Sequence, residues 1–165
     1  MVNPGPTINL FEFQEKAVTN LINLTTKTDA KETIVMKAPT GSGKTIILID
    51  YIDTYLSNVD KKTAFIWLCP GKGNLEEQSR EKMIKLSPGR STQNLFDALL
   101  GGFAEESTTF INWELVTKSG NIAIRDSERK NLFDRIAEAH RKGTEFIVII
   151  DEEHQNNTSK VDDII

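Results

Sequence analysis

The apolar positions along the chain alternate between helical spacing and short continuous runs. Apolar side chains recur at helical spacing over residues 11–24, which predicts a helix, whereas the run Thr-Ile-Val-Met within residues 32–37 is typical of a buried strand. A glycine-rich turn follows, and residues 46–56 predict a second helix that is apolar over much of its surface. Residues 1–7, which contain Pro-Gly-Pro, are expected to form a flexible lead-in.

The same order of strand and helix repeats further along the chain. Residues 63–69 predict a strand that ends at Pro70-Gly71, and residues 75–86 predict a charged helix. Residues 87–102 are ambiguous, because Ser-Pro-Gly-Arg indicates a loop while residues 94–100 fit a short helix.

The last part of the chain predicts one more helix between two strands. We expect strands over residues 108–112 and 146–150, and a helix over residues 127–142. The second of these strands is a continuous apolar run, as expected of a strand covered on both faces. Strands that alternate with helices predict an α/β domain over residues 8–165, with a mainly parallel sheet and right-handed crossovers.

Composition supports one ordinary globular domain. The chain has 165 residues, of which 38% are hydrophobic and 27% charged, which excludes a disordered tail and a fibre. It has neither an apolar run long enough to cross a bilayer nor the apolar core of a signal peptide. The single cysteine, Cys69, cannot form an internal disulfide, so we expect a cytoplasmic location.

The charge balance limits how the protein could contact nucleic acid. The formal net charge is −4, from 20 Lys and Arg against 24 Asp and Glu. Proteins that coat nucleic acid passively usually carry a basic surface, so any such contact must come from a local patch.

The first segment with specific chemistry is Ala-Pro-Thr-Gly-Ser-Gly-Lys-Thr, residues 38–45, between a predicted strand and a predicted helix. It matches the phosphate-binding loop at every fixed position except the first, where Ala38 replaces glycine. Glycines allow the backbone N–H groups to approach phosphates, the lysine reaches the β- and γ-phosphates, and the last hydroxyl binds Mg²⁺. The residues expected to bind the nucleotide here are Pro39, Thr40, Gly41, Ser42, Gly43, Lys44 and Thr45. The alternative is a glycine-rich turn that precedes Lys-Thr by chance.

The second such segment is Asp-Glu-Glu-His, residues 151–154, directly after the last predicted strand. In a phosphate-loop ATPase, Asp151 would hold Mg²⁺ through water, and Glu152 would orient and polarise the attacking water. Lys44, Asp151 and Glu152 are therefore the predicted catalytic residues, and Thr45 and Asp151 the predicted metal ligands. The alternative is solvated charge at the end of a strand. Because ligands of parallel sheets bind at the C-terminal ends of the strands, both segments are expected at one edge.

Together these residues resemble the first motor domain of superfamily 2 helicases and translocases of the DExH branch. Residues 38–45 resemble motif I, and Asp151, Glu152 and His154 resemble motif II; Glu153 stands where many members have alanine. The resemblance implies a three-layer RecA-like P-loop domain, ATP and Mg²⁺ as cofactors, and nucleic acid as partner. It also implies that His154 couples the ATP site to the neighbouring domain.

Two further segments extend the resemblance. Phe13-Gln14 is similar to the aromatic-glutamine element that recognises adenine, and an amide can both donate to and accept from the adenine edge. A segment with Pro70, Leu75 and Gln78 resembles motif Ia, which contacts the nucleic acid backbone in this family. The candidate nucleic-acid contacts are Lys72, Asn74, Gln78 and Arg80. The alternatives are a surface glutamine and a solvated loop and helix face.

The segment Thr-Phe-Ile-Asn-Trp-Glu, residues 109–114, resembles the Asn-Trp segment of type III restriction enzyme Res subunits, although Phe110 and Trp113 could also be ordinary core. This resemblance covers nearly the whole chain. It implies the ATP-binding part of a DNA translocase or helicase from a type III restriction-modification system, with a methyltransferase or specificity subunit as partner. A DExH RNA helicase and a nucleotide-gated interaction module without translocation are the alternatives.

The end of the chain bears on the expected activity. In the family that the sequence resembles, motif III, a second RecA-like domain and a C-terminal nuclease follow, whereas this chain ends soon after His154. Residues 8–165 are therefore expected to be an N-terminal motor domain truncated at its C-terminal end, which hydrolyses ATP poorly alone because charge-stabilising groups are missing.

Overall fold

The computed structural model describes residues 8–27, 33–39, 41–71, 74–114 and 132–151. Its helices are α1 (Glu12–Thr26), α2 (Lys44–Asn58), α3 (Leu75–Leu86), α4 (Leu95–Gly101) and α7 (Leu132–Arg141). Its strands are β1 (Thr63–Cys69), β2 (Ser91–Asn94), β3 (Ser107–Asn112) and β4 (Glu145–Ile150), paired all in parallel in the order β2-β3-β1-β4.

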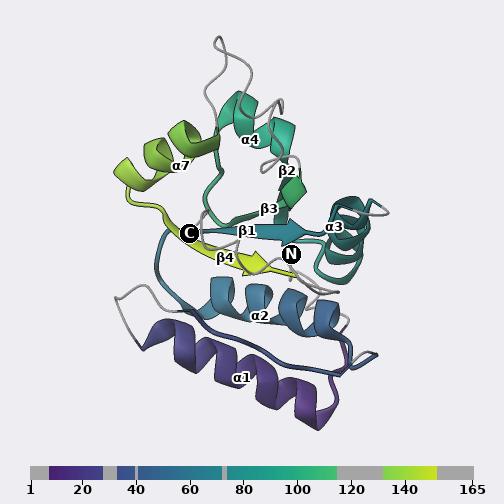
Figure 1. The fold of residues 1–165 in the computed structure, drawn as a ribbon. Helices are drawn as coiled ribbons and strands as arrows, with labels where there is room; N and C mark the ends of the chain where they lie inside the picture. Colours follow the sequence, from purple (N-terminus) through teal and green to yellow (C-terminus); the bar gives the residue numbers. More distant parts are fainter. Residues whose placement is uncertain (1–7, 28–32, 40, 72–73, 115–131, 152–165) are drawn as a thin grey trace.

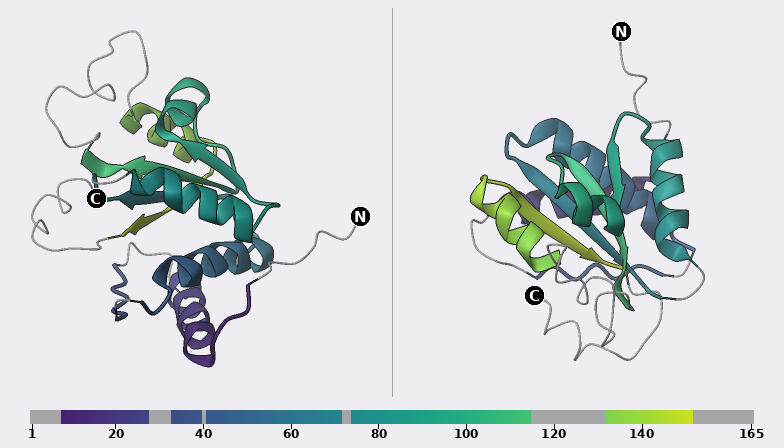
Figure 2. Two further views of the ribbon diagram at one scale, coloured as in Figure 1. Left: turned by 90° about the vertical axis from the view of Figure 1, so that its right-hand side faces the viewer. Right: turned by 90° about the horizontal axis from the view of Figure 1, so that it is seen from above.

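Helices cover both faces of the sheet to form three layers, and α1 packs on the side of α2 that faces away from the sheet (Figures 1 and 2). Strand β1 lies in the middle, and all its residues are buried. Phe65 and Trp67 pack with residues of α1, α2 and α3 in one core cluster, whereas Ile66 and Leu68 pack with α4 and α7 in another. Alternate side chains of a strand point to opposite faces, which is why β1 contributes to both clusters. The predicted α/β fold is confirmed.

The register of the sheet aligns the C-terminal ends of its strands. Cys69 of β1 pairs with Asn112 of β3, and Leu68 pairs with Ile150 of β4. The residues that follow these strands therefore emerge at one edge, where parallel sheets bind their ligands.

Helix α2 runs back along β1 and begins at that same edge. Only residues 59–62 connect its end to the start of β1, so its C-terminus lies at the opposite edge. Both elements are about 23 Å long at the usual rise per residue. Tyr51 and Tyr55 of α2 make edge-to-face contacts with Phe65, with ring centroids 6.0 and 5.5 Å apart. The N-terminus of α2 is thus at the C-terminal edge of the sheet.

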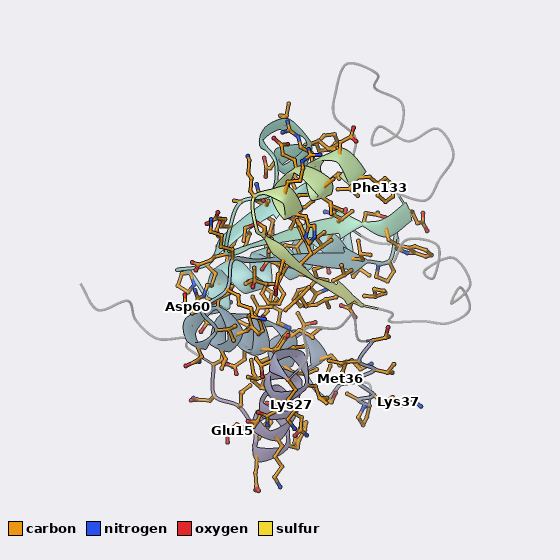
Figure 3. All side chains as sticks on the ribbon, turned by 90° about the vertical axis from the view of Figure 1, so that its left-hand side faces the viewer. Glu15, Lys27, Met36, Lys37, Asp60 and Phe133 are labelled. Carbon is orange, nitrogen blue, oxygen red and sulfur yellow. The ribbon has the colours of Figure 1, made fainter. Side chains whose placement is uncertain are left out.

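The strand predicted over residues 32–37 is not found: residues 33–39 are irregular and do not join the sheet. Met36 packs partly against the cluster on the α2 side, whereas Val35 is 73% exposed. Figure 3 shows Met36 and Lys37 beside α1, away from the strands. The apolar pattern thus reflects the partial burial of Met36, which is reached here without strand pairing.

Two other expectations need correction. Residues 146–150 do form a strand, but β4 is the last strand of the described sheet, and Val148 is 43% exposed rather than covered on both faces. The ambiguous stretch contains the helix expected near residues 94–100, as α4, and also strand β2, which was not predicted. Ser-Thr-Gln-Asn has no apolar alternation, so only its pairing with β3 reveals it as a strand.

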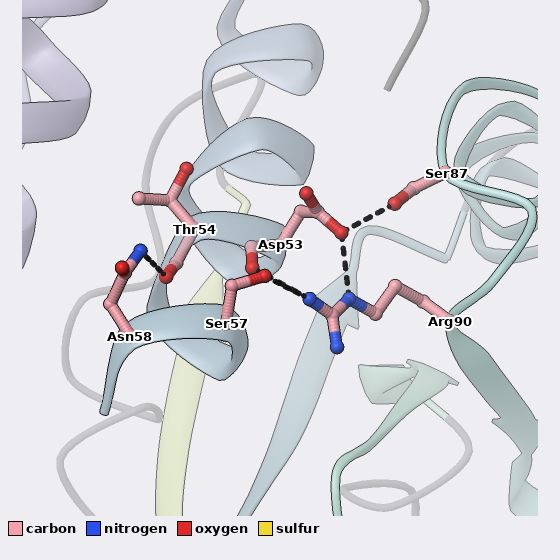
Figure 4. A network of polar contacts seen from close by, with 6 residues as sticks. All are labelled: Asp53, Thr54, Ser57, Asn58, Ser87 and Arg90. Atoms are coloured by element: carbon pink, nitrogen blue, oxygen red, sulfur yellow. Dashed lines mark hydrogen bonds and ion pairs between the residues drawn. The ribbon is translucent and has the colours of Figure 1, made fainter. Parts of the chain in front are cut away.

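An arginine connects α2 to the loop between α3 and β2 (Figure 4). Arg90 Nε donates to Asp53 Oδ1 at 2.7 Å, and its Nη2 donates to the Asp53 carbonyl oxygen at 2.9 Å and to the Ser57 hydroxyl. Ser87 Oγ donates to the same Asp53 carboxylate oxygen at 2.9 Å. The side chains of Arg90 and Asp53 are only 20% and 16% exposed, so this contact is largely shielded from solvent.

We expect Arg90→Ala to lower the free energy of unfolding by about 2 kcal/mol, because it leaves the shielded Asp53 carboxylate without its cation. Chemical denaturation of the two proteins measures the difference. The matched control is Arg141→Ala, at an exposed position at the end of α7, which should change stability by less than about 0.5 kcal/mol. Equal small effects of both substitutions would show that the contact contributes little.

Candidate nucleotide and metal site

The loop before α2 contains two glycines in a left-handed conformation and a tight turn. Gly41 and Gly43 have φ angles of +81° and +79°, a left-handed conformation that favours glycine. The Ser42 N–H donates to the Pro39 carbonyl oxygen at 3.1 Å, which closes a tight turn. Thr40 lies outside the described residues. Both glycines of the loop thus stand at positions whose backbone conformation favours glycine.

The loop leads directly into the N-terminus of a helix. Lys44 and Thr45 are the first residues of α2 and are half-buried, and Gly43 precedes them without a side-chain cap. The first N–H groups of a helix point out of its end and attract anions. Ser42 Oγ is buried and has no hydrogen-bond partner among the described residues. The N–H groups at this helix start and the buried Ser42 hydroxyl could therefore donate hydrogen bonds to a phosphate group.

Gln14 contacts this loop directly. Its side chain is only 5% exposed, its Nε2 donates to the Ser42 carbonyl oxygen at 2.9 Å, and its Oε1 accepts from the Phe11 N–H at 2.9 Å. Beside it, Phe11 and Phe13 are largely exposed and stack with ring centroids 6.0 Å apart. The structure therefore brings Gln14 to the loop. Its recognition of adenine stays a prediction.

Asp151 follows β4 at the C-terminal edge of the sheet. It is half-buried, and its N–H donates to the Leu68 carbonyl oxygen of β1 at 3.0 Å. Burial, and after it the negative charge of Asp151, raise the pKa of the neighbouring Cys69 thiol to about 12. Asp151 thus lies beside the end of β1, at the same edge as the start of α2. Glu152, Glu153 and His154 lie outside the described residues.

A glutamate that sequence reasoning missed lies at the same edge. The Glu114 side chain packs so closely over Gly71 that a Cβ atom at position 71 would overlap it. The Glu114 N–H donates to Asn112 Oδ1 at 3.0 Å, which fixes the turn after β3. The Asn-Trp-Glu sequence was the available signal. Among the described residues, no cluster of three or more His, Cys, Asp or Glu could hold a metal ion.

The candidate nucleic-acid contacts lie at or near the start of α3. Asn74 is exposed and begins the helix with φ +56°, and Gln78 is exposed one turn later. Arg80 Nε instead donates to Thr92 Oγ1 at 3.1 Å, and its Nη1 lies 3.8 Å from a Glu77 oxygen. Arg80 therefore holds α3 against β2 in this structure. Lys72 lies outside the described residues.

The two aromatic residues of the Asn-Trp segment differ in burial. Phe110 is core, 2% exposed, with its ring centroid 5.2 Å from that of Trp67. Trp113 is half-buried and packs against the cluster on the α7 side. The core alternative stated for Phe110 is confirmed.

Gly43→Ala should be more damaging than its backbone strain alone explains. A Cβ atom there would lie 2.6 Å from Gln14 Nε2. We expect a loss of about 2 kcal/mol or more in the free energy of unfolding, of which roughly 1–2 kcal/mol is left-handed strain. The matched control is Gly143→Ala, where φ is +91° and a Cβ would meet nothing within 4 Å. Equal losses in denaturation would contradict the close approach of Gln14.

A three-layer α/β fold with a glycine loop that leads into a helix is typical of RecA-like nucleotide-binding domains. The comparison with protein families makes the assignment specific: the chain belongs to the type III restriction enzyme, res subunit family, whose model matches residues 7–165. The comparisons with curated proteins and with solved structures gave no match. Family membership supports a helicase-like, ATP-dependent function related to DNA, in general. None of the described helices has the length and apolar character of a membrane span.

Proposed function

We propose that this chain binds ATP and Mg²⁺ at the loop before α2 and acts as the ATP-hydrolysing part of a DNA translocase or helicase, in a type III restriction-modification system. The observation that carries the proposal is the shared edge. The glycine loop, whose Ser42 hydroxyl has no partner within the described residues, lies at the C-terminal ends of the parallel strands, and so does Asp151.

Each residue has a defined task in this proposal. The Lys44 ammonium group binds the β- and γ-phosphates as a point charge, and the Thr45 hydroxyl and Asp151, through water, hold Mg²⁺. When bound, Mg²⁺ neutralises phosphate oxygens. Glu152, which follows Asp151 in the sequence, accepts a proton from the attacking water and orients it.

DNA is the proposed polymer because the family is one of restriction enzymes. The proposed contacts with the DNA backbone are Lys72, Asn74, Gln78 and Arg80. Arg80 would make such a contact while it keeps its hydrogen bond to Thr92 or in exchange for it. Since the net charge is −4, this contact must be local. A methyltransferase or specificity subunit is the proposed protein partner.

The test compares polymers in one assay. For the full-length protein, affinity for a non-hydrolysable ATP analogue and the rate of ATP hydrolysis are measured without a polymer, with duplex DNA and with RNA. A rise in both with duplex DNA supports the proposal: the rise in affinity shows that the nucleotide and DNA sites are coupled, and the rise in rate shows that DNA activates hydrolysis. A response to RNA alone would indicate an RNA helicase. Nucleotide binding that ignores both polymers would indicate a nucleotide-gated interaction module.

A further inference from the structure

The amide of Gln14 is fixed at both of its ends. Its Oε1 accepts from the Phe11 N–H and its Nε2 donates to the Ser42 carbonyl oxygen, each at 2.9 Å. Both partners are backbone groups of one fixed polarity, so exchanging the oxygen and nitrogen of the amide would break both bonds. Because the side chain is 5% exposed, water cannot easily replace either partner. Gln14 therefore holds the Ser42 carbonyl in one direction.

That direction also determines where a donor of the loop points. The Ser42 carbonyl and the Gly43 N–H belong to the same peptide group, and the described chain contains no cis peptide bond. In a planar trans peptide the C=O and N–H bonds point in opposite directions. The carbonyl faces Gln14, so the Gly43 N–H points away from Gln14.

The contact between the amide and the loop is close. A Cβ on Gly43 would lie 2.6 Å from Gln14 Nε2, so the amide occupies the space beside the Gly43 Cα atom. Rotation of the peptide between Ser42 and Gly43 would break the hydrogen bond of Gln14. The glycine and the glutamine together keep this peptide in one orientation.

We propose that Gln14 is a positioning residue that aims the Gly43 N–H at the polyphosphate of a bound nucleotide. This inference rests on the proposed function, because it assumes that the loop binds phosphates. It adds a role in which the adenine base takes no part: the affinity of the loop for a polyphosphate depends on Gln14. Within the described part of the chain, the Gln14 amide uses one of its two N–H bonds and one of its two lone pairs. The second N–H bond and the second lone pair remain to bind an adenine edge. Base and phosphate recognition are then coupled through one side chain.

The test uses inorganic tripolyphosphate, which has no base, titrated into the whole chain by calorimetry. Gln14→Met keeps a side chain of similar size without hydrogen bonds, and we expect about tenfold weaker binding, or about 1.4 kcal/mol. Gln14→Glu keeps the oxygen that accepts from Phe11, and with it the start of α1, but replaces the donor to Ser42; it should weaken binding at least as much. The control is Glu15→Ala, which truncates the exposed neighbour on the same helix and should leave binding unchanged.

A second measurement separates positioning from folding. The amide resonance of Gly43 should shift on addition of tripolyphosphate in the wild type and shift less in Gln14→Met, while the other resonances show an intact fold. Unchanged tripolyphosphate affinity in Gln14→Met, with only ATP binding weakened, would overturn the inference and leave Gln14 as a base-recognising residue. If the wild-type chain does not bind tripolyphosphate, or if Lys44→Ala leaves that binding unchanged, the loop before α2 is not a phosphate site. The proposed function is then rejected with it.

Discussion

Replacing Lys44 by alanine is expected to abolish nucleotide binding while the protein stays folded. Lys44 is the first residue of α2, where its ammonium group adds to the donors at the helix start. Charge-assisted contacts to phosphate are about twice as strong as neutral ones. We therefore expect ATP affinity to fall at least a hundredfold, or about 2.7 kcal/mol. Calorimetric titration with Mg-ATP measures this directly.

The control is Lys16→Ala on α1, a side chain 73% exposed whose ion pair with Glu12 spans one helical turn. It removes the same charge from the chain at a solvated position, so its effect on nucleotide affinity should be small. Equal affinity of the Lys44→Ala protein and the wild type would remove the loop before α2 from the nucleotide site.

Replacing Glu152 by glutamine should separate binding from turnover. The amide keeps the size of the side chain but cannot accept the proton of the attacking water. General base catalysis contributes roughly 10²–10⁴-fold, so the hydrolysis rate should fall by about that factor while ATP affinity changes little. Single-turnover hydrolysis by the intact protein in the presence of duplex DNA, together with a binding titration, measures both quantities.

Glu153→Gln is the matched control, because it removes the same charge one residue further along the chain. It is expected to keep most of the hydrolysis rate. If both substitutions slowed hydrolysis equally, loss of local negative charge would explain the effect and Glu152 would lose its assigned role.

Most of the fold can be predicted from the sequence because burial leaves a periodic pattern. The strand predicted over residues 63–69 and the helix predicted over residues 75–86 have those bounds in the structure. The pattern failed where burial and strand pairing differ: residues 34–36 are apolar but do not join the sheet, whereas β2 is polar and pairs with β3. Hydrogen bonds between strands leave no apolar signature.

The candidate site was likewise predicted only in part from the sequence. The glycine loop and Asp151 were predicted because short-range chemistry fixes their residue types and spacing. The bond between Gln14 and Ser42 spans 28 positions, and the network of Arg90 and Asp53 spans 37, so neither forms a local motif. Such contacts depend on how helices pack, and only the folded chain shows them.

The placement of the two tryptophans provides an optical probe for each layer of the molecule. Trp67 is fully buried in the cluster on the α2 side, beside the helix that begins at the glycine loop, whereas Trp113 packs against the cluster on the α7 side. The chain has only these two tryptophans, so a variant that keeps one of them has a single emitting indole. Fluorescence of the two single-tryptophan proteins would report separately on the two faces of the sheet, and coincident unfolding transitions would mean that both layers melt as one cooperative unit.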